Sequence, residues 1–207
     1  MKTLKESILN RSNHGAEGFK TQRRNEIEKW LKEYDIKNYT INDDLTIDVD
    51  GDVNLARKNL MEFPDYIQFG VVKGTFNCSS SRLTSLRGCP REVRRAFFCY
   101  DNQLTSLEGA PENVWYKFDC SSNKLTTLEG APEKVGAGFW CIHNNLTSLV
   151  GAPKEVGESF YCTHNKLTSL IGTPKEVRGD FYCSHNKVRF TENDVRRVCE
   201  VKGEIIV

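Results

Sequence analysis

The sequence predicts a β-rich solenoid that is built from 21-residue repeats and closed at both ends by caps. Three observations support this fold class. Phenylalanine and cysteine recur at a constant step, the repeated unit alternates as a short strand does, and the two ends of the chain lack the repeat. The predicted domains are an N-terminal helix and hairpin cap at 1–52, the solenoid at 53–190 and a C-terminal cap at 191–207.

The repeat is defined by columns of identical or similar residues. Six of the eight cysteines are spaced by 21 residues, and each follows a phenylalanine by two positions. These pairs are Phe76/Cys78, Phe97/Cys99, Phe118/Cys120, Phe139/Cys141, Phe160/Cys162 and Phe181/Cys183. Asparagine, leucine, glycine, proline and valine recur at the same step, so the unit reads F-x-C-x-x-N-x-L-T-S-L-x-G-A-P-x-x-V-x-x-x.

Each column of the unit has a physical interpretation. F-x-C has the period of a strand, so its Phe and Cys point inward and identical strands stack at a spacing of ~4.8 Å. The two leucines fill the core behind the strand, and the asparagine amide satisfies backbone groups of the bend and of an adjoining coil. Gly and Pro shape the return path. Little helix is expected there, only extended, polyproline-like or short 3₁₀ segments.

The ends read as caps. Residues 19–34 have largely helical apolar spacing, and residues 39–49 alternate around Asn42-Asp43-Asp44, which predicts a hairpin. A degenerate first coil begins at Val53. At the other end, Thr191 and Asp194 form a loose capping box that opens a short helix, and 204–207 reads as a last strand.

The repeat resembles leucine-rich repeats, and most closely the short bacterial class of the YopM and IpaH effectors. The likeness covers about residues 53–190 and is carried by Leu146-Thr147-Ser148-Leu149, followed by Pro153, Val156, Phe160, Cys162 and Asn165. The unit here is one residue longer, and Phe and Cys stand where that class has Leu and Val. The resemblance implies a leucine-rich-repeat solenoid with parallel strands on a concave face. The layout of the whole chain is also similar to small repeat proteins encoded by phages and gut bacteria.

Composition excludes several classes of protein. The chain has 29 basic and 28 acidic side chains, so a general nucleic-acid binder is not expected. No apolar run is long enough for a membrane span, and the first 20 residues lack the apolar core of a signal peptide. A cytoplasmic protein with free thiols is therefore predicted.

Catalytic and metal-binding constellations are not found in the sequence. It has no C-x-x-C pair, no phosphate-binding glycine loop, no H-E-x-x-H and no nucleophile elbow. A solenoid also presents near-identical surfaces, whereas an active site needs one unique cluster of groups. We therefore expect a non-enzyme without cofactor or metal, in which the cysteine column fills the core.

The surface of the short strands holds the candidate binding residues. If Phe and Cys point inward, the residues between and after them point outward, and these include many aromatics. Exposed aromatic patches are typical of interfaces. The expected partner-binding residues are Phe98, Tyr100, Asp119, Trp140, Ile142, Tyr161 and Tyr182, with the column His143, His164 and His185 beside them.

Two further features stay open at this point. The histidine column fits either a solvated edge or a metal or anion site. The cations Arg82, Arg87, Arg91, Arg94 and Arg95 crowd the first full repeat and fit either a solvated rim or a site for phosphate or an acidic partner.

The predicted function is non-catalytic binding of a protein partner by a monomer or weakly self-associating chain. One expectation, from the resemblance, is a phage or bacterial protein that interferes with a host defence factor. The alternatives are a structural component of a virion or assembly, with residues 1–12 as its address, and a carbohydrate-binding surface.

Overall fold

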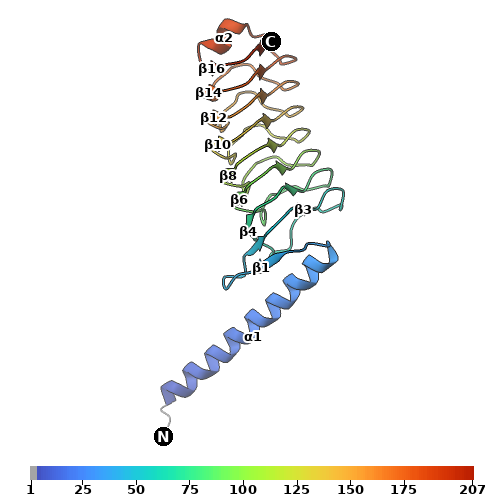
Figure 1. The fold of residues 1–207 in the computed structure, drawn as a ribbon, viewed down its shortest axis with the longest axis vertical. Helices are drawn as coiled ribbons and strands as arrows, with labels where there is room; N and C mark the ends of the chain where they lie inside the picture. The colour runs from blue at the N-terminus through green and yellow to red at the C-terminus, as the bar shows by residue number, and fades with distance from the viewer. Residues whose placement is uncertain (1–3) are drawn as a thin grey trace.

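The computed structural model describes the backbone of residues 4–207 and the side chains of 17–207. Successive coils stack as a nearly straight column, with helix α1 (Leu4–Glu33) at one end and helix α2 (Glu192–Arg196) at the other (Figure 1). The strands are β1 (Tyr39–Ile41), β2 (Ile47–Val49), β3 (Val53–Asn54), β4 (Phe69–Val72), β5 (Phe76–Asn77), β6 (Glu92–Val93), β7 (Phe97–Phe98), β8 (Asn113–Val114), β9 (Phe118–Asp119), β10 (Lys134–Val135), β11 (Phe139–Trp140), β12 (Glu155–Val156), β13 (Phe160–Tyr161), β14 (Glu176–Val177), β15 (Phe181–Tyr182), β16 (Glu200–Val201) and β17 (Ile205–Ile206).

Two sheets run along the column, and all their strand pairs are parallel except β1 with β2. The Phe-led strands β5, β7, β9, β11, β13 and β15 form the middle of an eight-stranded sheet with the order β17-β15-β13-β11-β9-β7-β5-β3, here called sheet B. The strands that end with Val belong to a nine-stranded sheet, β1-β2-β4-β6-β8-β10-β12-β14-β16, here called sheet A. Each repeat thus contributes one strand to each sheet. The parallel β-solenoid predicted from the repeat is confirmed, and sheet A occupies part of the return path where only irregular extended segments were expected.

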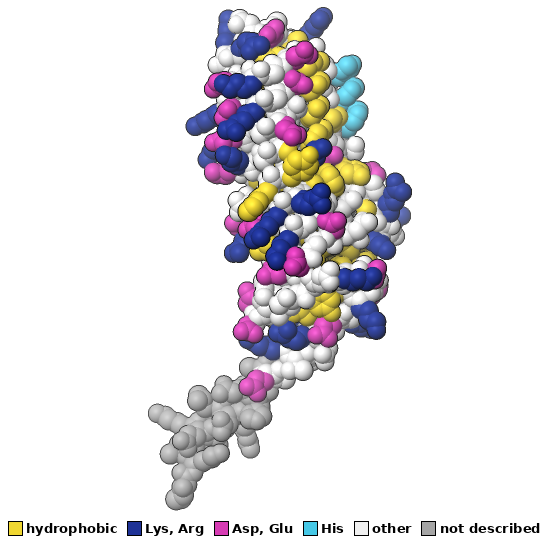
Figure 2. Space-filling view, viewed as in Figure 1, with side chains coloured by type: hydrophobic (Ala, Val, Ile, Leu, Met, Phe, Trp, Pro, Cys, Tyr) yellow, Lys and Arg dark blue, Asp and Glu magenta, His cyan; other side chains and the backbone are white. Residues whose placement is uncertain are grey.

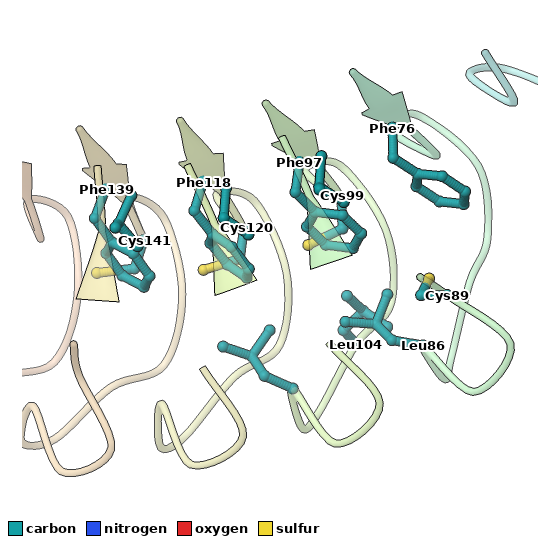
Figure 3. Packing of buried hydrophobic residues seen from close by; sticks show 14 of the residues in the cluster. Phe76, Leu86, Cys89, Phe97, Cys99, Leu104, Phe118, Cys120, Phe139 and Cys141 are labelled. Carbon is teal, nitrogen blue, oxygen red and sulfur yellow. The ribbon is translucent and has the colours of Figure 1, made fainter. Parts of the chain in front are cut away.

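The core is a set of ladders made by identical residues. Phe139 is fully buried, and its ring lies 5.2 Å from that of Phe118 and 5.5 Å from that of Phe160, in stacked orientation. Figure 3 shows the rings of Phe97, Phe118 and Phe139 entering the interior from successive strands, with a cysteine beside each. All eight cysteines are free and buried. Sγ of Cys141 donates to the carbonyl of Tyr161 in the next coil at 3.3 Å, so the thiol also links neighbouring coils.

The asparagine column makes a second ladder, of hydrogen bonds. Oδ1 of Asn144 accepts from the backbone N–H of Leu125 in the preceding coil, at 3.0 Å. Its Nδ2 donates to the carbonyls of Cys120 and Cys141 at 3.1 and 3.2 Å. One buried amide therefore satisfies backbone groups of its own bend and of the adjoining coil, which is the role predicted for this column.

The residue before each asparagine turns the chain. Positive φ angles of 51–57° recur at Ser80, Asp101, Ser122, His143, His164 and His185. This is the left-handed helical region, which costs most L-residues roughly 1–2 kcal/mol. The buried hydrogen bonds of the asparagine amide stabilise the bend, while the preceding residue adopts the left-handed backbone angle.

The N-terminal cap differs in length from the prediction. Helix α1 was predicted over 19–34 but begins at Leu4, and the buried residues among its described side chains are Ile27, Trp30 and Leu31. Phe19, assigned to the same apolar face, is 58% exposed. The predicted hairpin is confirmed, since β1 and β2 pair in antiparallel fashion. Residues 1–3 lie outside the described part, and nothing is described of the side chains of the proposed 1–12 address.

The C-terminal cap contains the predicted helix and strand. In α2, Oγ1 of Thr191 accepts from the N–H of Asp194, and the carboxylate of Asp194 accepts from the N–H of Thr191, so the capping box is present. Strand β17 then pairs with β15, with Tyr182 opposite Ile206. Strand β16, which extends sheet A, was not anticipated. Among the described residues, neither helix has the length and apolar content needed to cross a membrane.

Candidate binding surface

The outer face of sheet B carries three stacked aromatic side chains on consecutive coils. We call Trp140, Tyr161 and Tyr182 the aromatic ladder. The ring centroids of Trp140 and Tyr161 lie 5.1 Å apart with 7° between the planes, and those of Tyr161 and Tyr182 lie 4.4 Å apart with 11°. The strands pair in register, so each ring sits directly beside the next. The sequence reasoning that placed these side chains together on one outer face is therefore correct about their arrangement.

Stacking covers the ring faces of the ladder. Tyr161 has a ring on each side, and Nζ of Lys117 lies 5.5 Å from the centroid of the Trp140 ring. Trp140 also folds over Gly138, where an added Cβ would lie 2.5 Å from its ring. The ring edges and hydroxyls of the ladder are therefore more accessible than its ring faces.

A second aromatic pair lies nearer the N-terminal end of sheet B. Phe98 and Tyr100 meet edge to face, with centroids 6.2 Å apart. Asp119 stands between this pair and the ladder, because it is in register with Phe98 on one side and with Trp140 on the other. Burial raises the pKa of Asp119, although its carboxylate accepts from the N–H of Ser121 at 2.9 Å. The two aromatic patches are thus interrupted by one half-buried carboxyl group.

The histidine column runs parallel to the ladder. The rings of His143 and His164 lie 4.4 Å apart, and so do those of His164 and His185. Figure 2 shows them in cyan beside a hydrophobic stripe on the same side of the column. Burial between the neighbouring rings lowers the pKa of His164, and the charges of His143 and His185 lower it further. Ile142 precedes this column and is half-buried.

One exposed aromatic cluster was missed in the sequence. Trp115 and Tyr116 lie where the chain passes from sheet A to sheet B, and they are 59% and 46% exposed. Cζ of Arg94 lies 5.3 Å from the Trp115 ring, and Nζ of Lys117 lies 5.3 Å from the Tyr116 ring. We call Arg94, Arg95, Trp115, Tyr116 and Lys117 the aromatic–basic corner. The sequence does contain a signal when the repeats are aligned, since the segment between Val and Phe has at least one glycine in each of the next three coils but none in this one.

In the part of the chain with described side chains, potential metal ligands do not cluster and the thiols lie in the core. Within residues 17–207, no three His, Cys, Asp or Glu side chains are placed to hold a metal ion. Desolvation raises the pKa of the buried thiols of Cys120, Cys141 and Cys162 well above the usual value, and that of Cys183 to about 11. Thiolates are the reactive form of cysteine, so these side chains act as core residues.

The fold and the surface define a repeat protein of the parallel β-solenoid class. Comparisons with protein-family models, with curated proteins and with solved structures find no match to the chain.

Proposed function

We propose that this chain is a non-catalytic binding protein of the leucine-rich-repeat type that holds a protein partner on the outer face of sheet B. The observation that supports the proposal is the aromatic ladder, because three consecutive coils place a large aromatic on the surface of an otherwise polar repeat. Aromatic side chains are enriched in interfaces and dominate their energetics. The resemblance extends the proposal to a phage or bacterial protein that acts on a host factor in the cytoplasm.

The geometry of the ladder favours a protein over a carbohydrate. Sugars stack on open aromatic faces, but both faces of Tyr161 are covered by its neighbours in the ladder. Ring edges and hydroxyls suit the mixed apolar and polar contacts of a protein interface. The hydroxyl of Tyr182 already donates to Asp180 at 3.3 Å, which fixes the orientation of one such group.

Affinity capture with matched variants tests the proposal. The full chain, a Tyr161→Ala/Tyr182→Ala variant and a Val150→Ala/Ile171→Ala variant would be used as baits in lysate of the cells where the protein acts. The control variant also truncates two large side chains on consecutive coils, but these are exposed outside sheet B. Mass spectrometry should find one protein that is captured by the full chain and the control and lost by the ladder variant. Equal capture by all three baits would refute the ladder as the binding surface.

A further inference from the structure

The aromatic–basic corner is unique among the coils. The three residues between the Val of sheet A and the Phe of sheet B are Lys73-Gly74-Thr75, Arg94-Arg95-Ala96, Trp115-Tyr116-Lys117, Gly136-Ala137-Gly138, Gly157-Glu158-Ser159 and Arg178-Gly179-Asp180. Backbones of adjacent coils approach closely here, since an added Cβ at Gly136 would lie 1.8 Å from the carbonyl oxygen of Trp115. The fold therefore favours small residues at this corner, and two large exposed aromatics in one coil are not required by packing.

Two cations of the corner have no carboxylate partner among the side chains of residues 17–207. Arg94 is neutralised by Glu92, with 2.9 Å between Nε and Oε1. Arg95 and Lys117, in contrast, form no ion pair with any residue of the described part of the chain. Lys117 is held between the rings of Tyr116 and Trp140, at 5.3 and 5.5 Å from their centroids. The corner thus presents positive charge next to apolar rings (Figure 2).

We propose that the aromatic–basic corner binds an acidic segment of the protein partner, with carboxylates on Arg95 and Lys117 and an apolar side chain against Trp115. Charge complementarity of this kind selects partners and aligns them on the surface. Trp and Arg are among the residues that contribute most to interface energies. The inference rests on the proposed function, because Lys117 also contacts Trp140 and thereby joins the corner to the aromatic ladder.

The surroundings of the corner favour an acidic peptide over a single-stranded nucleic acid. A nucleic acid needs a track of cations that follows successive phosphates. Past the corner, the column of Lys117 continues as Gly138, Ser159 and Asp180, and that of Arg95 as Ala137 and Glu158. No cation follows in either column, and the chain as a whole carries a net charge of only +1. The positive site is therefore short and local.

Selection from random libraries tests this chemistry without knowledge of the partner. The full chain is panned against a display library of random peptides and, in parallel, a random single-stranded DNA pool. We expect enriched peptides that combine Asp or Glu with apolar residues, and no comparable enrichment of DNA. The Arg95→Glu/Lys117→Glu variant should bind those peptides roughly tenfold or more weakly. The Lys124→Glu/Lys175→Glu variant makes the same change in net charge at exposed positions elsewhere and should bind them normally. Circular dichroism confirms that each variant is folded.

Three results would overturn the inference. These are enrichment of peptides without an excess of acidic residues, equal loss of binding in both charge-reversed variants, and DNA enrichment that depends on Arg95 and Lys117.

The Tyr161→Ala/Tyr182→Ala variant separates this inference from the proposed function. Peptides that are lost by the corner variant but retained by the ladder variant would support the corner, and the ladder is then judged by the capture experiment. The opposite pattern would refute the corner and leave the proposed function in place.

Discussion

The rings of Tyr161 and Tyr182 lie 4.4 Å apart with 11° between their planes, and the buried rings of Phe160 and Phe181 on the same two strands lie 5.3 Å apart in stacked orientation. Two aromatic stacks therefore run along sheet B, one on each of its faces. The inner stack is fully buried, whereas the outer one is half-exposed. The inner stack belongs to the core and the outer stack to the proposed binding surface.

Adjacent residues of strand β13 should separate these two roles. Phe160→Ala removes a fully buried ring and should lower the free energy of unfolding by about 3–5 kcal/mol, as core aromatic truncations do. Tyr161→Ala removes a half-exposed ring and should cost less than about 2 kcal/mol, chiefly through the lost stacking. Urea denaturation of the two variants measures the difference. Equal losses of unfolding free energy in the two variants would mean that the ladder contributes mainly to the stability of the fold.

Asn144 of the asparagine ladder and its neighbour Asn145 are a second pair of adjacent residues that should differ in their contribution to stability. Asn144→Ala leaves the N–H of Leu125 and the carbonyls of Cys120 and Cys141 without their side-chain partner. Unsatisfied buried groups cost about 1–3 kcal/mol each, so a loss of at least ~2 kcal/mol is expected. Asn145→Ala alters a side chain that makes no hydrogen bond within the described residues, and its cost should stay within ~0.5 kcal/mol. Thermal unfolding of both variants tests this, and similar melting temperatures would contradict the assigned role.

The repeat columns made the inner side of this fold predictable. Phe-x-Cys alternation gave the buried face of sheet B, and the asparagine column gave the hydrogen-bonded bend. Both inferences were correct because every coil has to meet the same packing and hydrogen-bonding requirements. The same residue types therefore recur at the same positions of each repeat. The outward positions of Trp140 and Tyr161 followed from the same alternation.

Features without a repeated chemical signature were harder to predict. The repeated part of sheet A was missed because each of its strands, such as Glu155–Val156, contributes one inward apolar column, the valine, whereas Phe-x-Cys contributes two in strand-like alternation. The start of α1 was missed because apolar spacing begins at Phe19, while the preceding residues are largely polar. Trp115 and Tyr116 were missed because they belong to no repeated column, and the other coils vary at these positions.

The left-handed bend provides a prediction about backbone strain. Ser122 has a φ of 55° and an exposed side chain. Glycine adopts this conformation without steric cost, so Ser122→Gly should be neutral or stabilise the protein by up to about 1 kcal/mol. Ser122→Val places a β-branched residue there and should destabilise by about 1 kcal/mol or more. Chemical denaturation measures both changes.

Thr126 is the control for the bend. It is exposed in the same coil and is not among the residues with positive φ. Thr126→Gly should therefore destabilise the protein, since it only increases the flexibility of the unfolded chain. A stabilising effect at Thr126, or a destabilising effect of Ser122→Gly, would show that left-handed strain does not govern this position.

The histidine column should make the protein less stable in mild acid. The pKa of His164 is lowered from its usual 6.5 by burial between the two neighbouring rings and by their charges. The unfolded chain therefore takes up a proton at this site at higher pH than the folded chain does. Stability rises with pH wherever the unfolded state binds more protons, so it should fall as the pH drops through about 6.5 and level off below the folded pKa.

Nuclear magnetic resonance titration of the imidazole protons measures the pKa, and denaturation at a series of pH values measures the stability. The His143→Gln/His185→Gln variant removes both neighbouring charges and should return the pKa of His164 toward its usual value, with a weaker pH dependence of stability. An unchanged pKa in that variant would show that stacking with His143 and His185 does not control the titration.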